Sequence, residues 1–280
     1  MKVSGFTFIR NAVRYDFPVV EAITSTLPIV DEFIVNVGKS DDGTLELIRS
    51  IPSNKVRIVE SVWDESLRKD GLIYSQQTNI ALAQCTGDWA LYVQGDEIIH
   101  EQDLPALARA MKANLDNQSV RGLLFRYLHF MGDYWSLNPW FYHRAVRVIR
   151  NNGEVESCGD AVGFHLKTTR EYLQSGPKEW LADSGARVFH YGWVKESKTM
   201  LAKKREQVTV YTDRLSPEDQ RQIESEDWIF KEYDILKNFT GTHPAVMQER
   251  VNRFPKLKPD RNRWLQPAFY RAIAKKGFRG

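Results

Sequence analysis

Short apolar segments alternate with amphipathic segments along the first 113 residues of the chain. The apolar runs predict strands over 3–9, 31–37, 55–62 and 89–93. The intervening stretches have apolar residues near helical spacing and predict helices over 16–27, 42–51, 70–83 and 103–113. This alternation predicts an α/β fold with a mostly parallel central sheet flanked by helices. Asp16 and Asp42 are placed to cap the first two helices.

The pattern changes after residue 120. Two apolar runs, 120–130 and 145–150, predict strands with no helix between them, which indicates an antiparallel addition to the sheet. A further strand is predicted over 186–191. The remaining sequence has a helical pattern, and the predicted helices cover 197–212 and 217–237. We therefore expect two parts, an α/β domain over 1–195 and a helical C-terminal region over 196–280.

Composition places the chain among ordinary globular proteins. Its 280 residues are 42% apolar and 27% charged, which excludes disordered and fibrous classes. The two cysteines, Cys85 and Cys158, cannot form a disulfide framework and indicate free thiols in a reducing compartment. No apolar run reaches the length of a membrane span, and the first residues become polar too early for a signal peptide. The expected location is the cytoplasm.

Positive charge is concentrated at the end of the chain. Residues 250–280 contain ten Lys or Arg and one acid, which leaves a net charge of −6 on the rest. Aromatic residues lie between these charges, and the segment PAFYRAIAKKG predicts a short amphipathic helix. This tail is suited to peripheral contact with an anionic membrane at the inner face, to nucleic acid, or to packing on the acidic body. The acidic body disfavours nucleic acid.

Polar clusters follow three of the predicted strands. Arg10 and Asn11 follow the first strand, GKSDDGT over 38–44 follows the second, and Gln94-Gly95-Asp96-Glu97 follows the fourth. Because ligands bind at the carboxyl ends of parallel strands, we expect these clusters to share one site. Asp96 and Glu97 have no basic partner nearby in sequence, so Mn²⁺ or Mg²⁺ is the expected partner.

The order of these motifs resembles the family-two type of GT-A glycosyltransferases. The resemblance covers residues 3–200 and depends on VDEFIVNVGKSDDGT, on YSQQTNIALAQCTGDWALYVQGDE and, for a bacterial subgroup, on HFMGDYW and VFHYGW. It implies a Rossmann-like sheet that binds a nucleotide-diphospho-sugar. Two positions depart from the family. Gln94 replaces the first Asp of the Asp-x-Asp metal motif, and Val37 replaces an Asp that contacts the nucleotide base, so Asn36 or Asp41 would have to substitute.

The resemblance also implies roles for individual residues. The implied nucleotide-sugar-binding residues are Arg10, Asn11, Asn36, Asp41, Asp42, Gln76, Gln94 and Asp96. The implied metal ligands are Asp96 and His190, although a buried structural histidine remains the alternative for His190. Asp41 and Asp42 could equally serve only the turn and the helix cap.

An inverting transferase needs a general base for the acceptor hydroxyl. Asp160, in SCGDAVGF, is the candidate, with Glu154 and Glu156 as competitors. Positive side chains for the diphosphate and aromatic side chains for the sugar are also available, and each could instead be surface or core. These candidates are Arg68, Lys69, Lys203 and Lys204 for the diphosphate, and Trp135, Trp140, Tyr142 and Trp193 for the sugar.

The resulting prediction is a metal-dependent, inverting glycosyltransferase. It would move a sugar from a nucleotide-diphospho donor to a saccharide or lipid-linked acceptor. Two alternatives remain open, a non-catalytic nucleotide-sugar or glycan-binding module and a nucleic-acid-binding protein that uses the tail. A sugar-phosphate nucleotidyltransferase is disfavoured because SGFTFIRNAVR contains no Gly-rich phosphate loop.

Overall fold

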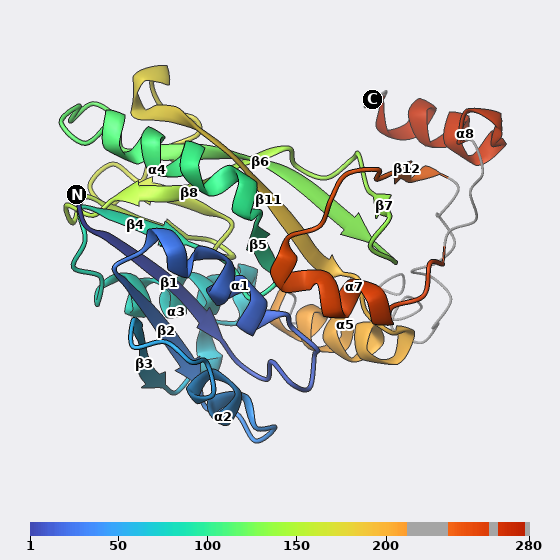
Figure 1. Ribbon diagram of the computed structural model, residues 1–280, viewed down its shortest axis with the longest axis horizontal. Coiled ribbons are helices and arrows are strands. Elements are labelled where there is room, and N and C mark those ends of the chain that lie inside the picture. Colours follow the sequence, from blue (N-terminus) through green and yellow to red (C-terminus); the bar gives the residue numbers. More distant parts are fainter. Residues whose placement is uncertain (212–234, 258–262, 278–280) are drawn as a thin grey trace.

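The structure is a computed structural model that describes residues 1–211, 235–257 and 263–277. Four strands at one side of its central sheet run parallel, in the order β3-β2-β1-β4 (Figure 1). These strands are β1 (Val3–Ile9), β2 (Glu32–Gly38), β3 (Val56–Ser61) and β4 (Trp89–Tyr92). Their carboxyl ends therefore meet at one edge, as the alternating pattern predicts.

The other side of the sheet is mixed. Strand β8 (Arg144–Arg150) pairs antiparallel with β4 and with β6 (Gly122–Met131). The long strand β11 (Leu181–Trp193) runs parallel to β6 and antiparallel to β5 (Glu97–Ile99). Shorter strands are β7 (Ser136–Leu137), β12 (Lys237–Asn238) and the separate hairpin of β9 (Val155–Cys158) and β10 (Gly163–Leu166). The predicted fold class and the antiparallel addition are confirmed.

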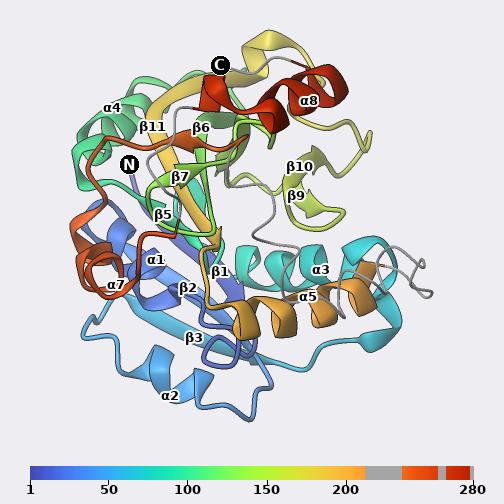
Figure 2. The same ribbon diagram turned by 90° about the vertical axis from the view of Figure 1, so that its right-hand side faces the viewer.

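Helices cover both faces of the parallel strands. On one face, α1 (Val19–Thr26) and α4 (Leu104–Ala113) bury Ile23 and Met111 against sheet residues such as Phe33. On the opposite face, α3 (Leu72–Leu82) and the β9–β10 hairpin enclose Phe6 and Tyr92. The other helices are α2 (Thr44–Arg49), α5 (Ser197–Tyr211), α7 (Gln248–Arg253) and α8 (Pro267–Lys276). Helix α5 packs on the 3₁₀ turn Lys69–Gly71 that leads into α3 (Figure 2).

The predicted helix caps meet different outcomes. Asp42 is not the N-cap residue of α2, which is Gly43, but its Oδ1 accepts hydrogen bonds from the backbone N–H and the hydroxyl of Thr44, the first residue of the helix. Asp16 does not cap α1, so that prediction is wrong. The backbone at Asp16 turns to a positive φ of 46°, Pro18 holds the N-cap position, and Asp16 Oδ1 accepts from Arg250 instead. The long-range ion pair displaces the local cap.

Helices α7 and α8 both pack against the α/β part. Met247, directly before α7, and Val251 of α7 pack in a cluster with Phe130 and Tyr191, and Arg250 pairs with Asp16 and Glu21. Phe269 and Ala272 of α8 pack beside Trp140 and Ile235. The amphipathic helix predicted near the end of the chain is confirmed as α8.

Three predictions about the C-terminal half stand as follows. The division at residue 195 stays a prediction. The helix predicted over 217–237 lies almost entirely outside the described residues. Within the described ranges, no helix combines the length and the apolar character that a membrane crossing requires.

Candidate functional site

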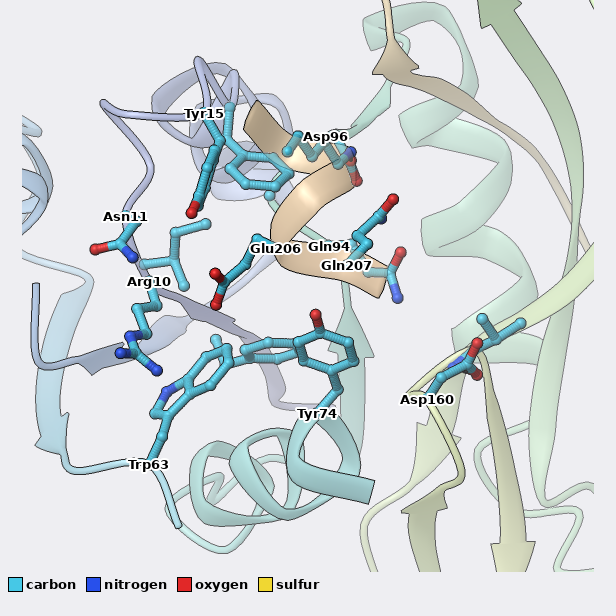
Figure 3. Close-up of a pocket in the computed structure, with 16 residues that line it drawn as sticks. Arg10, Asn11, Tyr15, Trp63, Tyr74, Gln94, Asp96, Asp160, Glu206 and Gln207 are labelled. Atoms are coloured by element: carbon cyan, nitrogen blue, oxygen red, sulfur yellow. Dashed lines mark hydrogen bonds and ion pairs between the residues drawn. The ribbon is translucent and has the colours of Figure 1, made fainter. Parts of the chain in front are cut away.

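A pocket opens where the parallel strands end (Figure 3). Its volume is about 180 Å³, and it lies between the ends of β1 and β4, the start of α3, helix α5 and the turn between β9 and β10. The pocket is lined by Phe8, Ile9, Arg10, Asn11, Tyr15, Phe17, Trp63, Tyr74, Gln94, Gly95, Asp96, Asp160, Val162, Lys203, Glu206 and Gln207. Segments separated by up to two hundred residues in sequence therefore contribute to one cavity.

Six residues that the sequence indicates line this pocket, namely Arg10, Asn11, Gln94, Asp96, Asp160 and Lys203. The guanidinium group of Arg10 lies over the ring of Trp63 and pairs with Glu65 at 2.7 Å. The backbone of Asn11 has a φ of 53°, and its N–H donates to Ser40. Gln94 donates to the carbonyl of Ala161, which joins the end of β4 to the turn that carries Asp160.

The other implied nucleotide-sugar residues lie outside this pocket. Asn36 is fully buried, and its amide donates to the backbone and the side chain of Gln77 on α3. Asp41 is exposed and pairs with Arg14 at 2.6 Å, while Asp42 accepts from the backbone N–H of Thr44 at the start of α2. Gln76 accepts a hydrogen bond from Gln77. Whether any of the four contacts a ligand stays a prediction, but the structure gives all four partners within the protein.

A second cavity of about 370 Å³ lies next to the end of β2. Val37, Gly38, Ser40, Ser61 and other residues line it. Val37 is therefore at the wall of a cavity, where the resemblance places a contact to the nucleotide base.

Asp96 lies at the pocket wall with a cation already beside it. The ammonium group of Lys203 on α5 donates to Asp96 Oδ2 at 3.1 Å and to the carbonyl of Gly192 at 3.0 Å. His190 Nε2 lies 3.7 Å from Asp96 Oδ1. Burial alone would raise the pKa of Asp96, but Lys203, His190 and Lys195 hold it far below its usual range. Asp96 is thus ionised at neutral pH.

Glu97 has a different environment from its neighbour. Arg147 donates two hydrogen bonds of 2.8 Å to Glu97, and both side chains are fully buried. Tyr127 donates a third hydrogen bond, at 2.7 Å. The expectation that these two acids would need a metal because they lack basic partners is therefore wrong in its premise. The partners, Arg147 and Lys203, come from distant strands and helices, which sequence proximity does not reveal.

The residues beside Asp96 still fit a divalent cation. The side chains of Asp96 and His190 present a carboxylate oxygen and an imidazole nitrogen, both of which Mn²⁺ accepts. Residue 192 is a glycine, and a Cβ there would lie 2.5 Å from Asp96 Oδ2 and 2.8 Å from His190 Nε2. Among the described residues no group of three or more His, Cys, Asp or Glu could hold a metal. Two protein ligands are sufficient where diphosphate oxygens complete the shell.

Several pocket residues are not among those that the sequence indicates. Trp63 and Tyr74 form an edge-to-face pair with ring centres 5.7 Å apart, and Tyr15 lines the opposite wall (Figure 3). Glu206 also lines the pocket, from α5. Helical spacing places Lys203 and Glu206 one turn apart on the same face, which was the one available signal.

The remaining sequence candidates have other partners. Glu154 pairs with Arg121, and Glu156 pairs with Arg170 and His165, so neither competitor of Asp160 lines the pocket. The aromatic candidates for sugar stacking also lie outside the pocket lining; these are Trp135, Trp140, Tyr142 and Trp193. Arg68 pairs with Glu65, and Lys204 lies over the ring of Trp193.

No protein-family model matches the chain, and no curated protein matches it. Among solved structures, S. aureus TarS 1–349 in complex with UDP is 14% identical, covering 82% of this chain and 73% of that chain, with a TM-score of 0.43. Glucosyl-3-phosphoglycerate synthase from Mycobacterium tuberculosis, with Mn²⁺, UDP-glucose and phosphoglyceric acid, is 20% identical (46% of this chain, 44% of that chain, TM-score 0.32).

A third similar structure is mannosyl-3-phosphoglycerate synthase from Rubrobacter xylanophilus. It is 21% identical over 46% of this chain and 41% of that chain, with a TM-score of 0.31. The chain thus spans less than half the length of the two synthases. With identities this low and TM-scores below 0.5, these likenesses decide nothing about the chemistry of this chain.

Proposed function

We propose that the chain is a glycosyltransferase that takes its sugar from a nucleotide-diphospho donor. The observation that carries the proposal is the meeting of Arg10, Asn11, Gln94, Asp96 and Asp160 in one pocket. They come from three separate motifs, and the site lies at the carboxyl ends of parallel strands, where α/β proteins bind nucleotides.

The pocket offers groups for each part of such a donor. Arg10 and Lys203 supply positive charge for the diphosphate, and the rings of Trp63 and Tyr74 supply flat apolar surface for a base or a sugar. Lys203 has three N–H donors, of which Asp96 and Gly192 accept two, so one remains for a phosphate oxygen. Preorganised donors of this kind stabilise a departing diphosphate.

Divalent metal dependence is part of the proposal. Asp96 and His190 would hold the ion, and Mn²⁺ or Mg²⁺ bound there would help to neutralise the diphosphate as it leaves. The metal identity is left to experiment. Gln94 brings no charge, so the protein contributes one carboxylate where the family motif has two.

Asp160 is the proposed general base of an inverting reaction. It lies in the turn between β9 and β10, across the pocket from Arg10 (Figure 3). A carboxylate in that position can accept the proton of an acceptor hydroxyl as it attacks the anomeric carbon. Glu206 is another carboxylate that lines the pocket, and it serves as the matched comparison.

The proposed acceptor is a saccharide or a lipid-linked saccharide, with the chain in the cytoplasm at the inner face of a membrane. Three exposed apolar side chains support peripheral contact: Trp264 and Leu265 lie just before α8, and Tyr270 lies within it. Aromatic side chains and basic charge together favour the surface of an anionic bilayer.

The first experiment is a thermal-shift panel of UDP, GDP, CDP and dTDP, each with and without Mn²⁺. A ligand at about 100 times its dissociation constant adds about 2.7 kcal/mol, which moves a melting curve by several degrees. One nucleoside diphosphate should stabilise the chain. Sugars linked to that same nucleoside diphosphate should then be donors, and the reaction with an acceptor should release the nucleoside diphosphate. Flat curves for all four would contradict the proposal, and binding without turnover would favour the non-catalytic module.

Two variants then test the base. Asp160→Asn should lower kcat by about 10²- to 10⁴-fold without weakening nucleotide binding, whereas Glu206→Gln should change kcat less. The opposite ranking would move the role to Glu206.

A further inference from the structure

Two histidines, the buried His129 and the partly buried His190, lie in a row that ends at Asp96. His129 Nε2 lies 2.8 Å from the carbonyl oxygen of Tyr142. His129 Nδ1 lies 3.1 Å from His190 Nδ1. The other nitrogen of His190, Nε2, lies 3.7 Å from Asp96 Oδ1. These contacts therefore connect the backbone carbonyl of Tyr142, through the rings of His129 and His190, with Asp96 at the pocket wall.

The carbonyl of Tyr142 determines where the protons lie. A carbonyl oxygen only accepts, so His129 Nε2 must carry a hydrogen. In a neutral His129 the other nitrogen then has none, so His190 Nδ1 must donate to it. His129 is 3% exposed, and burial disfavours a charged ring.

The positions of these hydrogens determine what His190 presents to Asp96. With its hydrogen on Nδ1, neutral His190 presents an unshared electron pair on Nε2 toward the ionised oxygen of Asp96. Two electron-rich atoms facing each other at 3.7 Å repel unless a cation lies between them. Gly192 leaves the adjacent space open, because a Cβ there would contact both side chains.

We propose that His129 is a positioning residue that holds His190 in the tautomer and orientation needed to ligate a divalent cation together with Asp96. This inference deepens the proposed function and depends on its metal site. His129 touches neither metal nor sugar and acts only through His190. Partners of this kind fix ring orientation, and their loss typically weakens metal binding by about 10- to 100-fold.

The first test measures the proton directly and needs no ligand. Long-range ¹H–¹⁵N spectra of the full chain distinguish the two imidazole tautomers. His190 is expected to carry its hydrogen on Nδ1 and His129 on Nε2. A His190 that carries its hydrogen on Nε2 would overturn the inference.

The second test measures Mn²⁺ affinity from the EPR signal of the free ion, in the presence of saturating nucleoside diphosphate. His129→Phe keeps a ring but removes both nitrogens, and it should raise the Mn²⁺ dissociation constant about 10- to 100-fold. His129→Asn places an amide oxygen near His190 Nδ1 and should recover part of the affinity.

The matched control is His100→Phe. His100 is also a buried histidine, 1% exposed, that packs on Phe189 and bonds to Thr242 without contact to His190. His100→Phe should lower the stability about as much as His129→Phe does, and it should leave the Mn²⁺ dissociation constant within about twofold of the wild-type value. Equal losses from His100→Phe and His129→Phe would mean that destabilisation alone explains the effect, which would overturn the inference.

Failure of the inference and failure of the proposed function give different results. If UDP, GDP, CDP and dTDP all leave the wild type unshifted with and without Mn²⁺, the donor site itself is wrong. If one of them binds but Mn²⁺ affinity is unchanged by His129→Phe, only the role of His129 is overturned. If one of them binds and no Mn²⁺ binds, the metal site and the role of His129 are both overturned, while the nucleotide site stands.

Discussion

Asp96 and Glu97 are adjacent in sequence, yet they belong to two different kinds of site. Glu97 lies in a sealed cluster, where Arg147 and Tyr127 satisfy both of its oxygens and no solvent reaches the pair. Asp96 borders an open pocket, with Lys203 beside one oxygen and the imidazole of His190 near the other. The comparison teaches that complete satisfaction marks a structural ion pair, whereas incomplete satisfaction at a cavity marks a candidate binding site.

The sealed cluster should be the more sensitive of the two to loss of charge. Glu97→Gln leaves Arg147 charged and fully buried without a counterion, and it should lower the free energy of unfolding by about 3–5 kcal/mol. Urea denaturation of the wild type and the variant at pH 7 measures this loss in the free energy of unfolding. The double variant Glu97→Gln, Arg147→Met should recover part of the loss, because no unpaired charge remains. A loss below about 1 kcal/mol for the single variant would remove the distinction between the two sites.

Compared with Glu97→Gln, Asp96→Asn should lower the free energy of unfolding less and weaken Mn²⁺-dependent nucleotide binding more. Lys203 keeps the carbonyl of Gly192 and borders the pocket, so we expect a loss of about 1–3 kcal/mol in the free energy of unfolding. The Mn²⁺-dependent part of the nucleotide-induced shift should disappear. Thermal shifts of both variants with and without nucleotide make the comparison, and an unchanged Mn²⁺ effect in Asp96→Asn would refute its role as a ligand.

Lys195 offers a pH-dependent contrast. Its side chain is buried, its ammonium donates to the carbonyl of Asp16, and burial lowers its pKa to about 7. Between about pH 7 and 10 the unfolded chain keeps this proton while the folded chain releases it, so this group makes stability rise with pH, by at most about 1.4 kcal/mol per pH unit. Urea midpoints at pH 7, 8 and 9 should rise less in Lys195→Met than in the wild type. If the urea midpoints of the wild type and Lys195→Met changed equally with pH, the lowered pKa of Lys195 would be contradicted.

The smallest effect is expected from an acid outside both sites. Asp41 is exposed and its pair with Arg14 is in solvent, so Asp41→Ala should change the free energy of unfolding by less than about 1 kcal/mol. Because Asp41 lies outside the pocket lining, Asp41→Ala should also leave the nucleotide affinity within about twofold of the wild-type value. A tenfold loss in a titration would restore Asp41 to the donor site that the resemblance implies.

Much of the fold could be predicted from periodicity. The parallel strands and the helices between them follow from apolar runs and helical spacing, which are local properties. The hairpin of β9 and β10 was missed because each strand is short and its pattern is weak. The cap at Asp16 was wrong because Arg250, far along the chain, binds that carboxylate.

The sequence by itself determined the fold class and the clusters Arg10-Asn11 and Gln94–Glu97 at strand ends, since strand polarity brings those ends to one edge. Only the tertiary structure decided that Glu97 is sealed by Arg147, that Lys203 reaches Asp96, and that His129 stands behind His190. The physical reason is range. Periodicity acts over a few residues, whereas charge pairing and burial join side chains that are 50 to 107 positions apart.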